Sequence, residues 1–318
     1  MMKTKTFTDE WGVTYNNYGR VLKVVNPKLF TCEEYNVPEG VEEVMDDAFL
    51  LSNPVLRKIH LPETLRKLGC NTFHRFPLEE IELPEGITEV PDCMCEGCQQ
   101  LRKVVLPSSV RTIKIGAFNC CQQLHEINLP DNIDIIEDEA FRYCESLKQI
   151  VLPPKLRYLS PELFYGSGIE TIEIPESITE ICYWAFWGCG NLKSLTIPAS
   201  VKSIHEGIVS AHEGFEGIEC HAKGYHVENE ALIDDENQEL LCCWTTQKHY
   251  VVPECVKKIG DMGGNKFVET ITVRQPVELT THEVFASNTN MRSIHFLGGV
   301  FGCEEQDFRN CPKLKKSM

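Results

Sequence analysis

The sequence predicts a β-rich solenoid in which short coils of 22 to 24 residues stack on one another. Prolines return at this nearly constant interval, apolar residues keep fixed distances from each proline, and a small residue followed by an aromatic one recurs within the interval. The prolines of the first array are Pro38, Pro62, Pro84, Pro107, Pro130, Pro153, Pro175 and Pro198. Such a period is the signature of stacked repeats, because one coil alone cannot bury its apolar side chains.

The segment that closes each coil has the form L-x-x-I-x-L-P, as in the run from Leu101 to Pro107 and the run from Leu124 to Pro130. Its apolar and polar residues alternate with a period of two and a proline ends it, so we expect a short β-strand. The strands of successive coils should form a parallel ladder on the concave face of the solenoid. The polar residues between the apolar positions should then point to solvent.

The middle of each coil predicts a turn on the side opposite the ladder. Apolar residues follow the proline at plus three and plus six, as with Val110 and Ile113, and a pair such as Ala117-Phe118 comes at plus ten and eleven. Acidic residues open this pair in some coils, for example Glu139. We expect a short helical or 3-10 turn there.

Two segments depart from the coil pattern and resemble each other. The pattern weakens after Pro198 and returns at Pro253, and the stretch before Pro253 aligns with the N-terminal stretch, Leu240 with Leu22. Each stretch has two short apolar runs around a polar turn, which predicts a β-hairpin. The expected organisation, with about eleven coils, is an N-terminal hairpin cap at 1–36, a repeat array at 37–221, a hairpin insertion at 222–252 and a second array at 253–318, continuous with the first.

The coil motif I-x-x-x-A-F-x-x-C-x-x-L-x-x-I-x-L-P resembles that of the BspA-like leucine-rich repeat family, also known as the Treponema pallidum type. The resemblance covers most of residues 37–318, and Thr72, Ile208, Gly263 and Arg274 stand at positions where the motif is not kept. It implies a leucine-rich-repeat solenoid that is curved and right-handed. It also implies a role in binding or adhesion, often on microbial surfaces, and no catalytic residues.

Charge and composition exclude several classes of partner. The chain has 47 acidic and 31 basic residues, a formal net charge of −16, and no block rich in Lys or Arg, so we expect no nucleic-acid partner. Its apolar stretches are too short for a transmembrane segment. The start of the chain, MMKTKTFTDEWGVTYNN, does not have the pattern of a signal peptide. We therefore expect a cytoplasmic protein, or a secreted or cell-surface one if a leader has been removed.

The sixteen cysteines include one group with the spacing of metal ligands, Cys93, Cys95 and Cys98. The repeat explains two of them more simply, because Cys98 stands at the recurring Cys position and Cys95 replaces the Phe. We expect a column of buried thiols about 5 Å apart. A reduced column is favoured over disulfide pairing, and we expect no metal and no cofactor.

A group of histidines lies where the repeat weakens. It consists of His205, His212, His221 and His226, with Glu206, Glu213 and Glu219 nearby in the sequence. We interpret them as loop residues of an irregular coil, with a metal or catalytic site as the alternative. The sequence contains no catalytic motif with the required spacing, so we expect no enzyme.

Two sets of exposed residues are candidates for binding a partner. In the first, Tyr183, Trp184 and Trp187 surround a core phenylalanine, and Tyr165 occupies the column of Trp187 one coil earlier. Stacked aromatic rings can bind a sugar or anchor a protein, although they can also simply cover neighbouring turns. The second set lies on the strand face and includes His60, Glu82, Asn128 and Glu173.

The sequence thus predicts a non-enzymatic scaffold that binds a protein ligand through its strand face or through the patch of Tyr165 and Trp187. A cell-surface adhesin or carbohydrate-binding protein is the first alternative. A hydrolase is the second alternative, with its site near residues 205–226.

Overall fold

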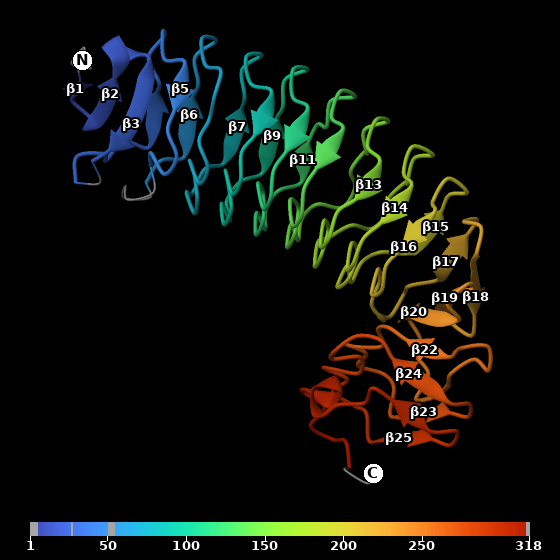
Figure 1. Ribbon diagram of the computed structural model, residues 1–318. Helices are drawn as coiled ribbons and strands as arrows, with labels where there is room; N and C mark the ends of the chain where they lie inside the picture. Colours follow the sequence, from blue (N-terminus) through green and yellow to red (C-terminus); the bar gives the residue numbers. More distant parts are fainter. Residues whose placement is uncertain (1–5, 27, 50–54, 316–318) are drawn as a thin grey trace. The chain divides into compact units, whose positions relative to one another are not determined.

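The computed structural model describes residues 6–26, 28–49 and 55–315. The chain divides into two compact units, Met1–Ile169 and Glu170–Met318. The described residues wind through about 12 turns and contain almost no helix, which confirms the leucine-rich-repeat solenoid that the sequence predicts. Figure 1 shows the strands of successive turns lying side by side within each unit.

In the first unit, the closing segments form a parallel strand ladder. Its strands are β4 (Glu34–Asn36), β6 (Lys58–His60), β7 (Glu80–Glu82), β9 (Lys103–Val105) and β11 (Glu126–Ile127). The central residues pair in register, Tyr35 with Ile59 and Ile81 with Val104. These central residues are buried, whereas most of the residues on either side of them are exposed, as the alternating pattern predicts. The alternation therefore fixes which side chains reach solvent on this face.

A second parallel ladder runs through the plus-five and plus-six positions of the coils, which the sequence does not identify as strands. It contains β5 (Glu43–Val44), β8 (Glu89–Val90), β10 (Thr112–Ile113), β12 (Ile135–Ile136) and β13 (Tyr158–Leu159). Val90 pairs with Ile113, which pairs with Ile136. Each strand is only two residues long, too short to produce an alternating pattern.

The turn side of each coil is also hydrogen-bonded to its neighbour. In the coil of Phe118, the amides of Gly116, Phe118 and Cys120 donate to carbonyls of the next coil at 2.9, 3.0 and 2.8 Å. Residues with left-handed backbone, such as Glu139 at φ 57°, recur along these turns and interrupt a regular helical path. Among the described residues, 3-10 helix is limited to η1 (Asn17–Gly19) and η2 (Glu305–Phe308).

A hairpin closes the N-terminal end of the first unit. Strands β1 (Phe7–Thr8), β2 (Val13–Asn16) and β3 (Val21–Val25) pair antiparallel, and β3 pairs parallel with β5 through Leu22 and Val44. Tyr35 donates a hydrogen bond to Asp9 at 2.8 Å, which ties the first ladder strand to this hairpin. The hairpin therefore covers the coil that would otherwise be open.

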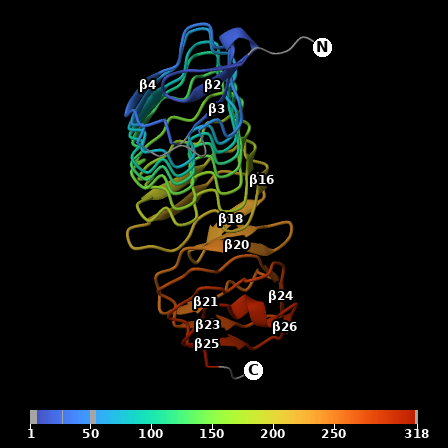
Figure 2. The ribbon, with the colours of Figure 1, turned by 90° about the vertical axis from the view of Figure 1, so that its left-hand side faces the viewer.

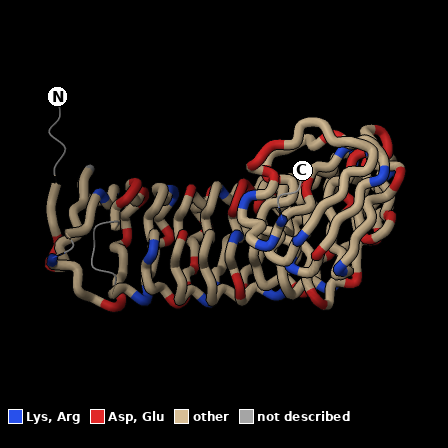
Figure 3. The backbone as a smooth tube through the Cα atoms, turned by 90° about the horizontal axis from the view of Figure 1, so that it is seen from below, with Lys and Arg blue, Asp and Glu red and all other residues tan. Residues whose placement is uncertain are grey.

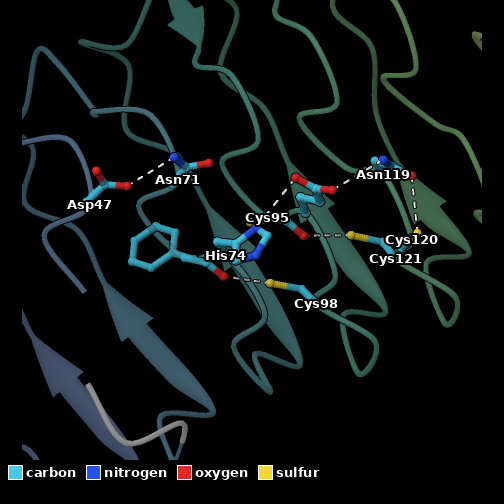
Figure 4. A network of polar contacts seen from close by, with 10 residues as sticks. Asp47, Asn71, His74, Cys95, Cys98, Asn119, Cys120 and Cys121 are labelled. Carbon is cyan, nitrogen blue, oxygen red and sulfur yellow. Dashed lines mark hydrogen bonds and ion pairs between the residues drawn. The ribbon is translucent and has the colours of Figure 1, made fainter. Parts of the chain in front are cut away.

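A column of thiols stacks in the core of the first unit, as the sequence predicts. Cys98, Cys121 and Cys144 each donate a hydrogen bond from Sγ to a backbone carbonyl of the preceding coil, at 3.0, 3.1 and 3.2 Å. Figure 4 shows the first two of these bonds. The three cysteines of this column are free thiols. Each thiol thus gives a buried carbonyl oxygen a second hydrogen-bond donor.

The second unit begins with coils of the same kind. Strands β14 (Glu180–Ile181) and β16 (Ser203–Ile204) pair parallel, as do β15 (Ser194–Ile197) and β17 (Gly217–Cys220). A three-stranded antiparallel segment follows, formed by β18 (Tyr225–Glu228), β19 (Ala231–Asp234) and β20 (Glu239–Cys243). This segment contains the second predicted hairpin.

The remaining coils of the second unit continue both ladders. Strand β20 pairs parallel with β22 (Lys258–Ile259), which leads to β24 (Val277–Leu279) and β26 (Val300–Phe301). Strands β21 (His249–Val251), β23 (Thr270–Val273) and β25 (Ser293–Phe296) form the other ladder, visible at the bottom of Figure 2.

The two hairpins are equivalent in detail. Ile233 pairs with Leu240 as Tyr15 pairs with Leu22, and in both hairpins the register shifts at the pair just before. The alignment of the two stretches is therefore confirmed at the level of strand pairing. The boundaries of the four segments along the chain stay a prediction.

Candidate functional site

The strand face of the first unit carries charges that largely neutralise one another. Lys58 lies 3.6 Å from Glu80, and Lys103 lies 2.5 Å from Glu126. Figure 3 shows acidic and basic residues interspersed along the coils of this unit. Exposed pairs of this kind contribute little to stability, but they cancel the local field. The surface at these paired side chains is therefore a poor site for recognising a charged ligand.

A groove lies beside these ion pairs, at the ends of β6, β7 and β9. It has a volume of about 360 Å³, and its lining residues are Ile59, His60, Leu61, Glu63, Glu82, Leu83, Pro84, Glu85, Val105, Leu106, Pro107 and Ser108. Its floor is formed by buried apolar residues of three successive coils, whereas its rim is polar. His60 and Glu82, both predicted as binding residues, are thus brought together in one concave site.

The rim of this groove is acidic. Glu63, Glu82 and Glu85 line it together with His60, and no Lys or Arg is among its described lining residues. His60 lies 2.7 Å from Glu34 through Nε2, and Ser108 donates to Glu85 at 3.1 Å. Glu82 is exposed on its strand. The groove therefore favours a cationic group over its apolar floor.

Asn128, the third candidate on the strand face, has a structural task. Its Oδ1 accepts a hydrogen bond from the amide of Leu106, and its Nδ2 donates to the carbonyl of Leu106, both at 2.8 Å. The side chain thus completes the ladder where β11 has ended. Glu173 is exposed and belongs to the second unit, outside the strands. Of the four strand-face candidates, the groove contains two.

Two of the aromatic candidates pack against glycines of later coils. In the second unit, a Cβ atom at Gly207 would come within 2.5 Å of Trp184 Cδ1, and one at Gly264 within 2.4 Å of Trp187 Cζ2. Trp184 also donates from Nε1 to Asp261 at 3.3 Å. One part of each indole is thus covered by the protein itself, as expected if these aromatic rings cover neighbouring turns.

Tyr183 and Trp184 are nevertheless 40% and 43% exposed. The ring of Tyr183 packs against the imidazole of His205, with centroids 4.4 Å apart. His205 in turn lies 2.9 Å from Glu180 through Nε2. This cluster presents aromatic and polar groups together on the surface of the second unit.

Tyr165 belongs to the first unit and is held there by an arginine. The guanidinium of Arg142 lies 4.8 Å from its ring centre and 4.6 Å from that of Tyr143, and the two rings meet edge to face. Burial raises the pKa of Tyr165 to about 12. Because Tyr165 and Trp187 lie in different units, their shared patch stays a prediction.

The cysteine group suspected of binding a metal is divided between core and surface. Cys98 is buried in the thiol column and Cys95 is buried at the Phe position of the same coil, where burial raises its pKa well above the usual range. Cys93 is half-buried, and its own backbone is left-handed. Burial together with a hydrogen bond to Glu96 raises the pKa of Cys93 to about 12. The repeat therefore accounts for Cys95 and Cys98.

The four histidines near the weak coil have different partners. His205 lies beside Glu180, His221 beside Glu219, and His212 bonds the carbonyl of Glu213. Two groups in the described part of the chain bring His, Cys and Glu ligand atoms within 4.8 Å of one another: Glu180 with Cys182 and His205, and His226 with Glu228 and Cys255. The sequence predicts neither group. The first group joins residues of different coils, and the second joins the hairpin to a coil.

Comparisons with known proteins agree with this architecture. The family model described as the BspA type leucine rich repeat region matches residues 28–148, 113–237 and 242–317. A search of curated proteins finds no match. None of the helices in the described residues has the length and apolar composition to cross a membrane.

Several solved structures share the fold. A leucine rich cell surface protein of Faecalibacterium prausnitzii is 20% identical, with a TM-score of 0.68 over 99% of this chain and 80% of that one. The pneumococcal vaccine antigen PcpA is 14% identical, with a TM-score of 0.53 over 98% and 80%. A leucine-rich repeat protein of Bacteroides ovatus is 19% identical, with a TM-score of 0.50 over 99% and 92%.

Proposed function

The chain belongs to the BspA-type leucine-rich repeat family, and from this premise we propose that it is a non-enzymatic scaffold that binds a protein through the groove on its first unit. Solenoids of this class offer extended, rigid surfaces on which strands and turns hold side chains at fixed spacings. The groove supports the proposal because it is the place where the predicted residues His60 and Glu82 meet.

The composition of the groove indicates the kind of partner. Leu61 and Val105, which are only half-buried, offer apolar surface, and Glu63, Glu82 and Glu85 surround it with carboxylates. The volume of about 360 Å³ lies at the lower end of the range for ligand pockets, which suits one or two side chains. We propose that the partner inserts a Lys or Arg, whose aliphatic stem lies on the floor while its charge meets the rim.

The charge of the whole chain supports the same partner. A net charge of −16 attracts a basic protein over a distance and accelerates the encounter at low salt. The association rate should therefore fall as the ionic strength rises.

We place this function at a cell surface rather than in the cytoplasm. The structural relative from Faecalibacterium prausnitzii is described as a cell surface protein, which supports the surface alternative. The cytoplasmic location expected from the sequence receives no such support. Mild treatment of intact source cells with a protease checks this: loss of the protein while a cytoplasmic marker survives is expected, and complete protection would contradict it.

Glycan binding receives less support than protein binding. Trp184 and Trp187 each lie against a glycine of another coil, which leaves less of each indole for stacking on a sugar ring. A protein ligand at the acidic groove is therefore the better proposal.

The groove can be tested with displayed peptides. A random peptide library is selected on the immobilised protein, and the enriched peptides are synthesised and titrated. We expect a shared Lys or Arg, and an affinity reduced about tenfold by Glu82→Gln, which corresponds to ~1.4 kcal/mol. The control Glu145→Gln removes the same charge from an exposed site outside the groove and should leave the affinity unchanged. Enriched peptides without a basic residue, or indifferent to Glu82→Gln, would contradict the proposal.

A further inference from the structure

Three side chains with metal-ligand chemistry meet where the second hairpin faces the following coil. His226 and Glu228 lie on β18, and Cys255 lies in the turn after Pro253. The Sγ of Cys255 is 3.3 Å from Glu228 Oε2, and this oxygen is 3.6 Å from His226 Nε2. All three ligand atoms lie within 4.8 Å of one another. These residues are called the hairpin cluster below.

The local structure explains how the cluster assembles. His226 and Glu228 are two residues apart on one strand, so their side chains project from the same face. The antiparallel pairing of β18 with β19 fixes that face, since His226 is opposite Ile233 and Glu228 opposite Ala231. Two of the three ligands are therefore positioned by backbone pairing rather than by a loop.

Cys255 is not explained by the repeat. It stands two residues after the coil's proline, a turn position where the other coils have Gly40, Thr64, Gly86, Ser109, Asn132, Lys155, Ser177 and Ser200. Cys255 is only half-buried and lies outside the thiol column of the core. An accessible thiol thus replaces a polar or small residue at the place where His226 and Glu228 are within reach.

The orientation of His226 suits a metal ligand. Asp235 lies 2.5 Å from its Nδ1, so this nitrogen carries the proton and donates it to the carboxylate. The lone pair of Nε2 then faces Glu228 and Cys255. A carboxylate behind the imidazole is the usual partner of a metal-binding histidine, because it fixes the tautomer and the direction of the ring.

We propose that His226, Glu228 and Cys255 bind one Zn²⁺ ion, with Asp235 as the positioning residue of His226. Imidazole, carboxylate and thiolate together form a ligand set typical of zinc. In a tetrahedral site with bonds of about 2.0 to 2.3 Å, ligand atoms are roughly 3.3 to 3.7 Å apart, which matches the two distances above.

Binding requires only a small change in the cluster. The thiol proton of Cys255, which is donated to Glu228, leaves to solvent, and the metal takes its place between sulfur and oxygen. Thiolate and carboxylate then balance the two charges of the ion. Three protein ligands leave a fourth position for a water molecule.

The metal would connect the hairpin to the coil that follows it. His226 and Glu228 belong to β18, at the edge of its six-stranded mixed sheet, whereas Cys255 opens the coil of β22. A zinc ion between them would fix β18, the strand that does not itself pair with the coil. This would stiffen the second unit where the regular coils are interrupted.

Cobalt substitution tests the site in the folded protein. The chain is purified with a reductant and a chelator, both are removed, and Co²⁺ is added stepwise. We expect a thiolate-to-cobalt charge-transfer band that saturates at one equivalent and disappears when Zn²⁺ is added. Absence of this band, or a band that persists unchanged in Cys255→Ser, would overturn the proposal.

Matched variants separate this site from the other thiols. Cys255→Ser restores the residue type that several coils have at this position, so it should fold, and equal urea midpoints of the metal-free proteins check this. Cys182→Ser and His205→Gln alter the other His/Cys/Glu group and should keep the band. Asp235→Asn should keep the band and weaken zinc binding about 10- to 100-fold. Loss of the band in Cys182→Ser with its retention in Cys255→Ser would assign the metal elsewhere.

Discussion

The phenyl ring of Phe141 stacks on that of Phe118 in the neighbouring coil, with ring centroids 5.7 Å apart and ring planes 11° apart. On its other side Phe141 makes a similar stack with Phe164 at 5.8 Å. All three side chains are fully buried. The Ala-Phe position of the repeat therefore builds a column of stacked rings from Phe118 to Phe164 in the core of the first unit.

Phe141→Ala should destabilise the protein by about 3 to 5 kcal/mol, because it removes a buried ring between two others and leaves a cavity that the stacked coils cannot close. Urea denaturation measures the change. Val151→Ala is the control: its side chain is 85% exposed, so its effect should stay within about 0.5 kcal/mol. A change below about 1 kcal/mol for Phe141→Ala would mean that this column is not part of the core.

Asn128→Ala should cost about 1 kcal/mol, because the amide and carbonyl of Leu106 both lose their partner. The same substitution should leave peptide binding at the groove unchanged, since Asn128 does not line it. Urea denaturation and peptide titration are made on the same protein sample. A loss of binding without a loss of stability would mean that Asn128 takes part in binding the peptide.

Gly207→Ala should be more costly than Gly214→Ala. Both glycines have left-handed backbone, at φ 68° and 91°, so both substitutions carry a penalty of about 1 to 2 kcal/mol. The Cβ atom at position 207 also meets the carboxylate of Asp261 and the indole of Trp184, whereas at position 214 nothing lies within 4 Å. The difference in unfolding free energy measures these two close contacts together and should exceed about 1 kcal/mol. Equal costs would mean that Asp261 and Trp184 both move away freely.

The stability of the reduced protein should fall above about pH 9. Burial raises the pKa of Cys144 above its ordinary value of 9.0, and it acts in the same way on Cys95 and Cys121. The unfolded chain therefore loses these protons first as the pH rises, which favours unfolding. Each such thiol contributes a slope of about 1.4 kcal/mol per pH unit above its unfolded pKa.

Urea denaturation at several pH values, with a reductant present, measures this slope. Cys144→Ala removes one of the titrating thiols and should reduce it. A slope that is the same with and without Cys144 would mean that this thiol does not retain its proton in the folded protein at these pH values.

The period of the sequence predicts much of the fold because each coil repeats the same burial pattern. The residues from Leu101 to Pro107 indicate a strand by alternation, and Phe118 and Phe141 indicate a core column by recurrence. The sequence does not predict the second ladder, because a strand of two residues such as Thr112 and Ile113 is too short to show alternation. Its strands are defined by the hydrogen bonds between coils.

The candidate sites depend on which residues of different coils come together. His60 and Glu82 are predicted separately as exposed ladder residues, and only the packing of the successive coils shows that they share a groove. Trp184 and Asp261 are 77 positions apart, and no local pattern connects them. For the hairpin cluster, the one sequence signal is Cys255 at a turn position where the other coils are polar or small.

The joint between a hairpin and the coil that follows it has a consequence for how such chains change in length. Leu22 pairs with Val44, and Leu240 pairs with Ile259, in the same parallel way in which ordinary coils pair. A hairpin therefore presents the next coil with the same edge that a coil would present. Duplication or loss of a whole coil at such a joint preserves every register downstream, whereas insertion of a single residue within a ladder strand would reverse which side chains face the core.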